Sequence, residues 1–192
     1  MPSKHNYLEH TTFAFLDIET TGGNLSRDRI TEIGIRFWRA GAVVDEWQTL
    51  LNPDVRISPF IEQLTGISNA MVADAPSFAS IADTLEEQLR DTVFVAHNAR
   101  FDYGFIKSEY RRLGRLFSAR VLCTVKLSRR LYPEFRQHNM DALIERHGLT
   151  QVQRHRAMGD VAAMLEFFTH ALADKGVATL EESIAALLQS PS

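Results

Sequence analysis

Two carboxylates stand two residues apart where an apolar segment ends. Asp17 and Glu19 follow the run FAFL that begins at Phe13. In an extended strand, side chains two residues apart point to the same face. A lone Asp-x-Glu pair at a strand end usually just meets solvent. This pair, however, follows a segment apolar enough for a core strand, where carboxylates bind metals or transfer protons. We therefore treat Asp17 and Glu19 as candidate metal ligands.

Two later segments carry further residues of the same kind. Asp102 closes the run that starts at His97 and is expected in the first turn of a helix after a buried strand. The helix dipole favours an acid there, so Asp102 alone could equally be a capping residue. In the run RHRAMGDVAAM the apolar period begins near Ala157, which places His155 in an entry loop and Asp160 in the first turns of a helix.

The four carboxylates of Asp17, Glu19, Asp102 and Asp160 carry a charge that two divalent cations would balance. Hard oxygen ligands without cysteine or paired histidine ligands favour Mg²⁺ or Mn²⁺ over Zn²⁺. Two such ions about 3.5–4 Å apart can hold the attacking water and the leaving oxygen of a phosphoryl displacement. Histidine side chains titrate near neutral pH, which suits His155 to take the proton from that water. These residues indicate metal-dependent phosphodiester hydrolysis.

The three segments resemble, in order and in spacing, the three exonuclease motifs of the DEDDh family, typified by the proofreading epsilon subunit of bacterial DNA polymerase III. The similarity runs from about Thr12 to His170 and includes 28–34 (DRITEIG) and 64–67 (LTGI). One motif would be weak, but three in order are specific. The resemblance implies a ribonuclease H-like fold, two Mg²⁺ or Mn²⁺ ions, a histidine base, and release of nucleoside 5′-monophosphates from the 3′ end of a strand.

The resemblance also implies a role for each matched position. Asp17 would bridge both ions, Glu19 and Asp160 would complete one ion site, and Asp102 would serve the other. His155 would be the general base. These five residues are the predicted catalytic set.

Five further positions are expected to contact the substrate by the same resemblance. Thr20 and Thr21 would lie along the terminal nucleotide, and His97, Asn98 and Phe101 would line the same cleft. His97 could equally be a core histidine that is hydrogen-bonded to the backbone.

The elements that must position these residues follow from the apolar periodicity. Three strands separated by glycine-containing turns predict an antiparallel meander, and a later β-α-β unit adds parallel strands. The expected strands are Thr12–Ile18, Arg29–Trp38, Ala42–Leu51, Thr92–Ala96 and Ala119–Leu122. The expected helices are Pro59–Leu64, Phe78–Arg90, Phe101–Leu113, Thr124–Leu131, Met140–His147, Met158–Ala173 and Leu180–Leu188, with a loop over Thr65–Pro76. The predicted fold class is α/β, with a mixed five-stranded sheet flanked by helices.

The expected domain organisation is one exonuclease domain over residues 1–173, followed by a short helix and tail over 174–192. Ser190 to Ser192 resemble the beginning of a linker. Three segments resemble relatives of epsilon in which this domain precedes a GIY-YIG endonuclease module: 17–23 (DIETTGG), 97–105 (HNARFDYGF) and 127–136 (LSRRLYPEFR). The chain is thus expected to be a free-standing version or the N-terminal piece of a longer repair nuclease.

The distribution of charge points to a nucleic-acid partner although the net charge is −3. Between Arg100 and Arg156 stand 13 Lys or Arg and only 5 Asp or Glu. Such asymmetry is typical of either a nucleic-acid footprint or a solvated helix face. Candidates for holding the phosphate backbone are Arg111, Arg112, Arg115, Arg129, Arg130 and Arg136.

Three functional classes agree with these features: a DNA exonuclease in proofreading or repair, an RNA-trimming exonuclease, and a catalytically silent interaction module. The filled catalytic positions disfavour the silent module. DNA is favoured over RNA by the resemblance alone, because the choice depends on contacts to the 2′-hydroxyl. A polymerase or repair complex is the expected class of protein partner.

The remaining composition indicates a cytoplasmic protein without a membrane segment. The single cysteine, Cys123, agrees with a reducing compartment. The first ten residues lack the apolar middle region of a secretory signal, and no apolar stretch reaches the roughly 18 residues of a membrane span.

Overall fold

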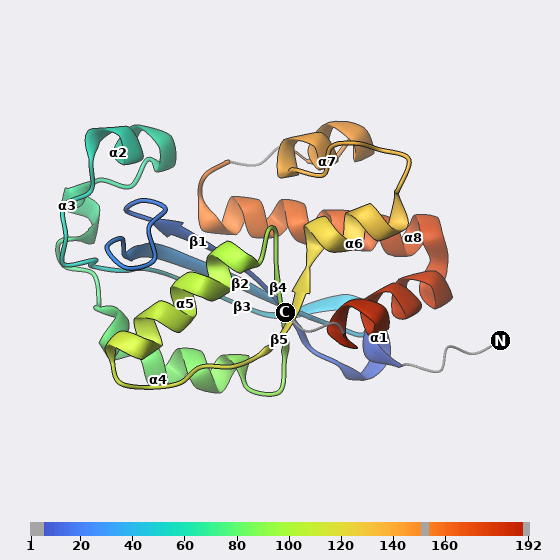
Figure 1. Ribbon diagram of the computed structural model, residues 1–192, viewed down its shortest axis with the longest axis horizontal. Coiled ribbons are helices and arrows are strands. Elements are labelled where there is room, and N and C mark those ends of the chain that lie inside the picture. Colours follow the sequence, from blue (N-terminus) through green and yellow to red (C-terminus); the bar gives the residue numbers. More distant parts are fainter. Residues whose placement is uncertain (1–5, 151–153, 190–192) are drawn as a thin grey trace.

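The computed structural model describes residues 6–150 and 154–189, and within them five strands form one mixed sheet (Figure 1). The strands are β1 (Phe13–Thr20), β2 (Ile30–Arg39), β3 (Ala42–Leu50), β4 (Val93–Ala96) and β5 (Arg120–Cys123). Their order across the sheet is β3-β2-β1-β4-β5. The β1–β2 and β2–β3 pairs are antiparallel, while β4 is parallel to both β1 and β5. The predicted meander with added parallel strands is confirmed.

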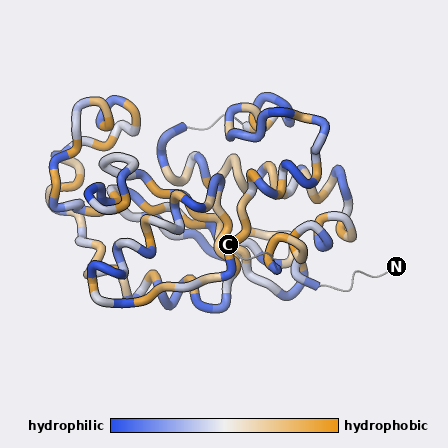
Figure 2. Tube along the Cα trace, in the orientation of Figure 1, coloured by the Kyte–Doolittle hydropathy of each residue, from blue (hydrophilic) through white to orange (hydrophobic). Residues whose placement is uncertain are grey.

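Helices cover both faces of the sheet (Figure 1). They are α1 (Tyr7–His10), α2 (Pro59–Thr65), α3 (Asn69–Val72), α4 (Phe78–Leu89), α5 (Arg100–Arg112), α6 (Thr124–Leu131), α7 (Met140–His147) and α8 (Ala157–Gln189). Helices α6, α7 and α8 share one core with the sheet, and α4 and α5 share the other. Figure 2 shows apolar residues gathered on the central strands between these layers.

Strand β1 shows how the sequence assigns its two faces. Phe13 and Phe15 pack in the core on the α8 side, where their rings lie 5.5 and 5.2 Å from that of Phe168. Ala14 and Leu16 belong to the core on the α4 and α5 side. Because side chains alternate along a strand, the odd-numbered residues that follow continue the α8 face. The carboxylates of β1 therefore point toward the layer that contains α8.

The last helical segment is bent, and its two halves share one core. Gly176 has a φ of 79°, which interrupts the helical backbone of α8 between the two helices that the sequence predicts. Beyond the bend, Leu180 and Ile184 are buried in the same cluster as β1 and β4. The domain boundary at residue 173 stays a prediction, although side chains after it contribute to this core. Residues 190–192, expected as the start of a linker, lie outside the described residues.

Two short helices were not predicted from the sequence. Helix α1 lies in the N-terminal segment, and α3 lies in the stretch from Thr65 to Pro76 that was expected to be a loop. Four residues are too few to display a helical apolar period. In α3 the cap is local, since the Ser68 hydroxyl accepts a hydrogen bond from the Met71 N–H at 3.2 Å.

Among the described helices, none combines the length and the apolar character needed to cross a bilayer.

Candidate active site

Three carboxylates from two elements converge at the end of β1. Asp17 and Glu19 come from β1, and Asp160 comes from the first turn of α8. One ligand oxygen from each lies within 4.8 Å of the others. Hard oxygen donors at this spacing fit Mg²⁺ or Mn²⁺. The structure thus brings together three of the four acids singled out from the sequence.

The fourth acid, Asp102, reaches the same strand from the opposite layer. It lies in the first turn of α5, is 2% exposed, and its Oδ1 accepts a hydrogen bond from the Ile18 N–H at 3.3 Å. Strand β4 pairs with β1 only from Phe13 to Phe15, so this N–H lies beyond the paired segment. The side chain of Asp102 therefore satisfies a buried donor of β1 next to Asp17, which goes beyond the capping role weighed for it from sequence.

The electrostatics of the cluster favour a bound cation. Burial first, and then the charges of Asp102, Asp160 and Glu19, raise the pKa of Asp17 well above its ordinary value. Burial and then Asp160 raise the pKa of Glu19 to about 8. Burial is also the main cause of the raised pKa of Asp102. Crowded, desolvated carboxylates repel one another unless protons or cations sit between them, so the donor set is suited to divalent metal ions.

An ion pair between the buried Glu32 and the partly exposed Arg156 fixes the start of α8. Glu32 of β2 is 4% exposed, and its carboxylate accepts hydrogen bonds from Arg156 Nη2 at 2.6 Å and from the Ala157 N–H at 3.0 Å. The pair ties β2 to the first turn of the helix that carries Asp160. Sequence reasoning noted the segment around Glu32 as part of a family pattern but assigned this residue no role.

The strand opposite Asp17 leaves room for that helix. Gly34 is the Cα partner of Asp17 across the β1–β2 ladder. A Cβ at Gly34 would lie 3.0 Å from both the backbone nitrogen and the sulfur of Met158, and 3.1 Å from the carbonyl carbon of Ala157. The close approach of α8 to β2, and with it the position of Asp160, depends on the missing side chain.

Arg154 is a member of the site that the sequence analysis missed. Its Nη1 donates to Oδ1 of Asp160, and its Nε donates to Oδ1 of Asp141 in α7 at 3.0 Å. The guanidinium partly offsets the rise in the pKa of Asp17 that burial and the neighbouring carboxylates cause. No local sequence signal could have identified this contact, because it depends on how α7 lies beside the start of α8.

Because the Arg154 guanidinium is bonded to the Asp160 carboxylate, we predict that Arg154 competes with metal ions for that carboxylate. We expect Arg154→Gln to bind Mn²⁺ about ten-fold more tightly, since the carboxylates lose their internal cation while keeping their mutual repulsion. Isothermal titration calorimetry of the purified variant against the wild type measures this without any nuclease assay. Arg39→Gln, an exposed arginine at the far end of β2, is the matched control. Weaker Mn²⁺ binding by Arg154→Gln would contradict the competition.

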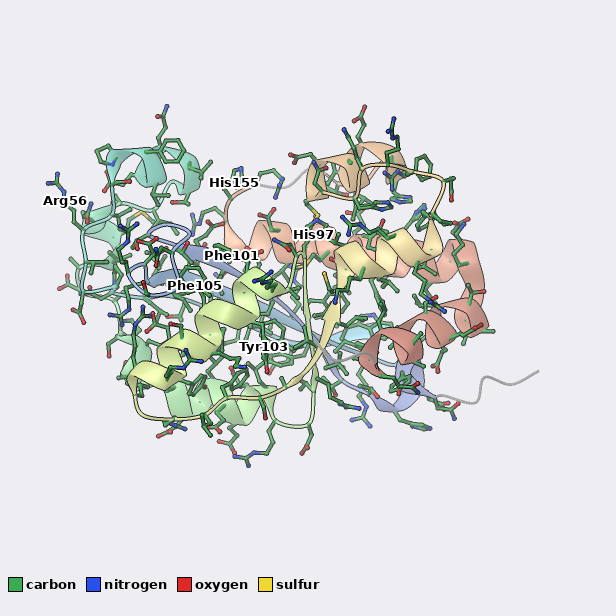
Figure 3. The ribbon with its side chains drawn as sticks, in the orientation of Figure 1. Arg56, His97, Phe101, Tyr103, Phe105 and His155 are labelled. Carbon is green, nitrogen blue, oxygen red and sulfur yellow. The ribbon has the colours of Figure 1, made fainter. Side chains whose placement is uncertain are left out.

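His155 lies in the turn just before α8 (Figure 3), five residues before Asp160, with its side chain exposed. Its φ of 58° is in the left-handed region, which is unusual for a residue other than glycine. Such conformations are more frequent at functional sites than elsewhere. Among the described residues, His155 has no hydrogen bond to the carboxylates.

His97 is held at the end of β4 by a side chain. Its Nδ1 lies 2.9 Å from Oγ1 of Thr124, and that hydroxyl lies 3.4 Å from the Ala96 carbonyl oxygen. Burial, followed by the charge of Arg154, lowers the pKa of His97 to about 4, so its ring is neutral at neutral pH. Within the described residues its buried Nε2 has no partner. This arrangement differs from the core histidine bonded directly to backbone that was considered from the sequence.

The other expected substrate contacts lie at the end of β1, in the turns that follow β1 and β4, and at the start of α5. The Thr20 hydroxyl donates to the Gly22 carbonyl oxygen at 2.7 Å, and the Thr21 hydroxyl accepts from the Arg29 N–H at 3.0 Å. Both hydroxyls therefore shape the turn after β1. Asn98 is exposed with a φ of 59°. Phe101 is partly buried, with its ring 4.9 Å from that of Phe105 (Figure 3). Contact of these residues with a substrate stays a prediction.

The sheet is mixed, its first strand ends in two acids, and the helix that faces them supplies a third. This arrangement defines a ribonuclease H-like nuclease fold, and comparison with known proteins agrees. The model of the exonuclease family RNase_T matches residues 14–168, and the chain belongs to this family. The predicted relationship to the epsilon-like exonucleases and the predicted fold are confirmed.

Curated relatives carry the same domain within much longer chains. The chain is 37% identical over 180 residues to the PolC-type DNA polymerase III of Caldanaerobacter subterraneus subsp. tengcongensis, covering 92% of this chain and 13% of that protein. It is 39% identical over 150 residues to the 3′-5′ exonuclease DinG of Staphylococcus epidermidis, covering 78% of this chain and 17% of that protein. The chain thus spans only a small part of these relatives.

A solved structure of similar length also matches. Exonuclease X, in complex with 5′ overhanging duplex DNA, superimposes with a TM-score of 0.70 at 26% identity. The match covers 93% of this chain and 99% of that one. The similarity therefore extends over nearly the whole chain.

Proposed function

We propose that this chain is a metal-dependent 3′-to-5′ exonuclease that hydrolyses phosphodiester bonds of DNA and releases nucleoside 5′-monophosphates. The observation that carries the proposal is the convergence of Asp17, Glu19 and Asp160 within 4.8 Å, with Asp102 bonded to the same strand. Membership of the exonuclease family supports the reaction class. A relative named as a 3′-5′ exonuclease supports the polarity, and a neighbour bound to duplex DNA supports the substrate.

The proposed cofactors are two Mg²⁺ or Mn²⁺ ions, with Asp17 shared between them, Glu19 and Asp160 at one and Asp102 at the other. Bound there, the ions would activate the attacking water and stabilise the leaving oxygen. The chain itself holds the four carboxylates in place through β1, α5 and the Glu32–Arg156 pair. The proposed role of His155, beside this cluster in the chain, is to accept the proton of the water as general base.

Thr20, Thr21, His97, Asn98 and Phe101 are the proposed contacts to the terminal nucleotide. A polymerase-linked proofreading or repair role is supported by the PolC-type relative. The second candidate function is RNA trimming by the same carboxylates, since metal ions act on the phosphate and are indifferent to the 2′-hydroxyl. A silent interaction module is disfavoured, because a crowded acidic cluster with raised pKa values is costly to keep without a ligand.

Digestion of end-labelled single strands tests the proposal. With Mg²⁺ or Mn²⁺, we expect a 3′-labelled DNA to release its label as a mononucleotide and a 5′-labelled DNA to give a descending ladder. Removal of the metal with EDTA should stop both, because the carboxylates alone cannot activate water. Matched RNA strands form the comparison. Shortening of RNA but not DNA would favour the trimming function, and digestion of neither would contradict the nuclease assignment.

A further inference from the structure

A basic groove lies on the outer side of α5, next to the segment that precedes Asp102. It encloses about 880 Å³ between α5, β5 and α6. Four cations line it: Arg100, Lys107 and Arg111 of α5, and Lys126 of α6. Among the described residues that line it there is no carboxylate. The groove therefore concentrates positive charge in a cavity of ligand size.

The cations of α5 form one stripe along the helix. Arg100, Lys107 and Arg111 are spaced by seven and four residues, which places them on a single helical face. At 1.5 Å per residue the stripe is about 16 Å long. A strand of B-form DNA presents a phosphate about every 3.4 Å along the axis, so the stripe can follow several phosphates. Tyr103, labelled in Figure 3, comes from the same helix and also lines the groove.

Two neighbouring arginines form ion pairs with carboxylates and therefore differ from the cations of this stripe. Arg112 Nη1 pairs with the buried Glu109 at 2.9 Å, and Glu109 is also held by Arg29 at 2.8 Å. Arg115 pairs with Asp83 at 2.6 Å and with Glu86. Two of the arginines predicted to hold a phosphate backbone are thus structural.

The groove cations, in contrast, are exposed and have no carboxylate partner within the described part of the chain. Lys107 makes a cation–π contact, with its Nζ 5.2 Å from the centre of the Tyr103 ring. A second cavity, at the amino ends of β4 and β5, provides a contrast, because Glu86 and Asp91 balance Arg90 and Arg120 there. Of these two cavities, only the α5 groove carries uncompensated charge.

The groove is continuous with the catalytic segment. Asn98 and Ala99, which immediately precede α5, line the groove together with Arg100, which lies in the same first turn of α5 as Asp102. We infer that the groove binds the phosphate backbone of the DNA substrate at nucleotides beyond the one being removed. This inference rests on the proposed function and deepens it, since it assigns to α5 both a metal ligand on its inner face and a strand-binding surface on its outer face.

Equilibrium binding of a fluorescent single-stranded DNA in EDTA tests the groove independently of catalysis. We expect Lys107→Gln/Arg111→Gln to raise Kd about ten-fold at moderate salt. The slope of log Kd against log salt should fall by about 1.4, which is about 0.7 for each phosphate of a single strand that the variant no longer neutralises. Arg39→Gln/Arg90→Gln removes two exposed arginines elsewhere and is the matched control. An equal change in both variants, or no change in either, would overturn the inference.

Kinetics with substrates of two lengths separate this inference from the proposed function. The p-nitrophenyl ester of thymidine 5′-monophosphate is too short to leave the carboxylate cluster, so its kcat/KM should be the same in the groove variant and in the wild type. A long strand should show a raised KM in the groove variant. Hydrolysis of both substrates with unchanged KM values would refute the groove alone, whereas no hydrolysis by the wild type would refute the nuclease function. If the variant lost inhibition by free mononucleotides but kept its strand KM, the groove would be a nucleotide site instead.

Discussion

Asp17→Asn is expected to abolish hydrolysis, by at least about 10³-fold in kcat, because Asp17 is the proposed ligand shared by both metal ions. The amide keeps the shape of the side chain but loses the charge. Burial and three neighbouring carboxylates raise the pKa of Asp17, so an ionised Asp17 costs free energy when no cation is bound. The variant should therefore be at least as stable as the wild type without metal, and each 1 kcal/mol of relieved repulsion would raise Tm by about 2–4 °C.

The measurement pairs nuclease activity with thermal unfolding in EDTA and in Mn²⁺. Metal should raise the Tm of the wild type and have little effect on the variant, since binding to the folded state is what stabilises it. Asp91→Asn is the matched control, an exposed aspartate before β4 at the opposite end of that strand from the site. Retained activity in Asp17→Asn would remove the shared-ligand assignment, and a large fall in its Tm would mean that Asp17 is structural.

His155→Ala is expected to lower kcat about 10²–10⁴-fold, the usual contribution of a general base. Because the side chain is exposed and is not a proposed ligand, the variant should keep both the Tm and the Mn²⁺ affinity of the wild type. Single-turnover hydrolysis over a range of pH gives a sharper result. The rise of the rate with pH that a general base produces should disappear in the variant.

The control for His155 is His10→Ala, an exposed histidine in α1, which precedes the amino end of β1, whereas Asp17 and Glu19 lie near the other end of that strand. It should hydrolyse DNA like the wild type. Loss of Mn²⁺ affinity in His155→Ala would reassign the residue as a metal ligand. Wild-type kcat and an unchanged pH profile would exclude it as the base and direct attention to His97, whose ring is neutral and whose Nε2 is buried without a partner in the described residues.

The sequence by itself determined the layers and the types of residue at the site. Side-chain alternation in β1 follows from local backbone geometry, so the placement of Phe15 in one core and Leu16 in the other was predictable. The same alternation predicted that Asp17 and Glu19 share a face. Helical periodicity gave α4 through α7 to within about two residues at each end, the normal uncertainty of helix boundaries. Short helices such as α3 were not predicted, because four residues are too few to show a helical apolar period.

Only the tertiary structure decided which side chains contact the acids and which cations lack a carboxylate partner among the described residues. The Glu32–Arg156 pair joins residues 124 positions apart, and Gly34 matters only because α8 crosses β2 beside it. Arg154 reaches Asp160 while bonded to α7, a contact that no period in the sequence encodes. Local patterns report which face a side chain occupies, whereas contacts between distant segments depend on strand order and helix packing. For that reason the sequence identified the chemistry of the carboxylates, and the fold determined their neighbours.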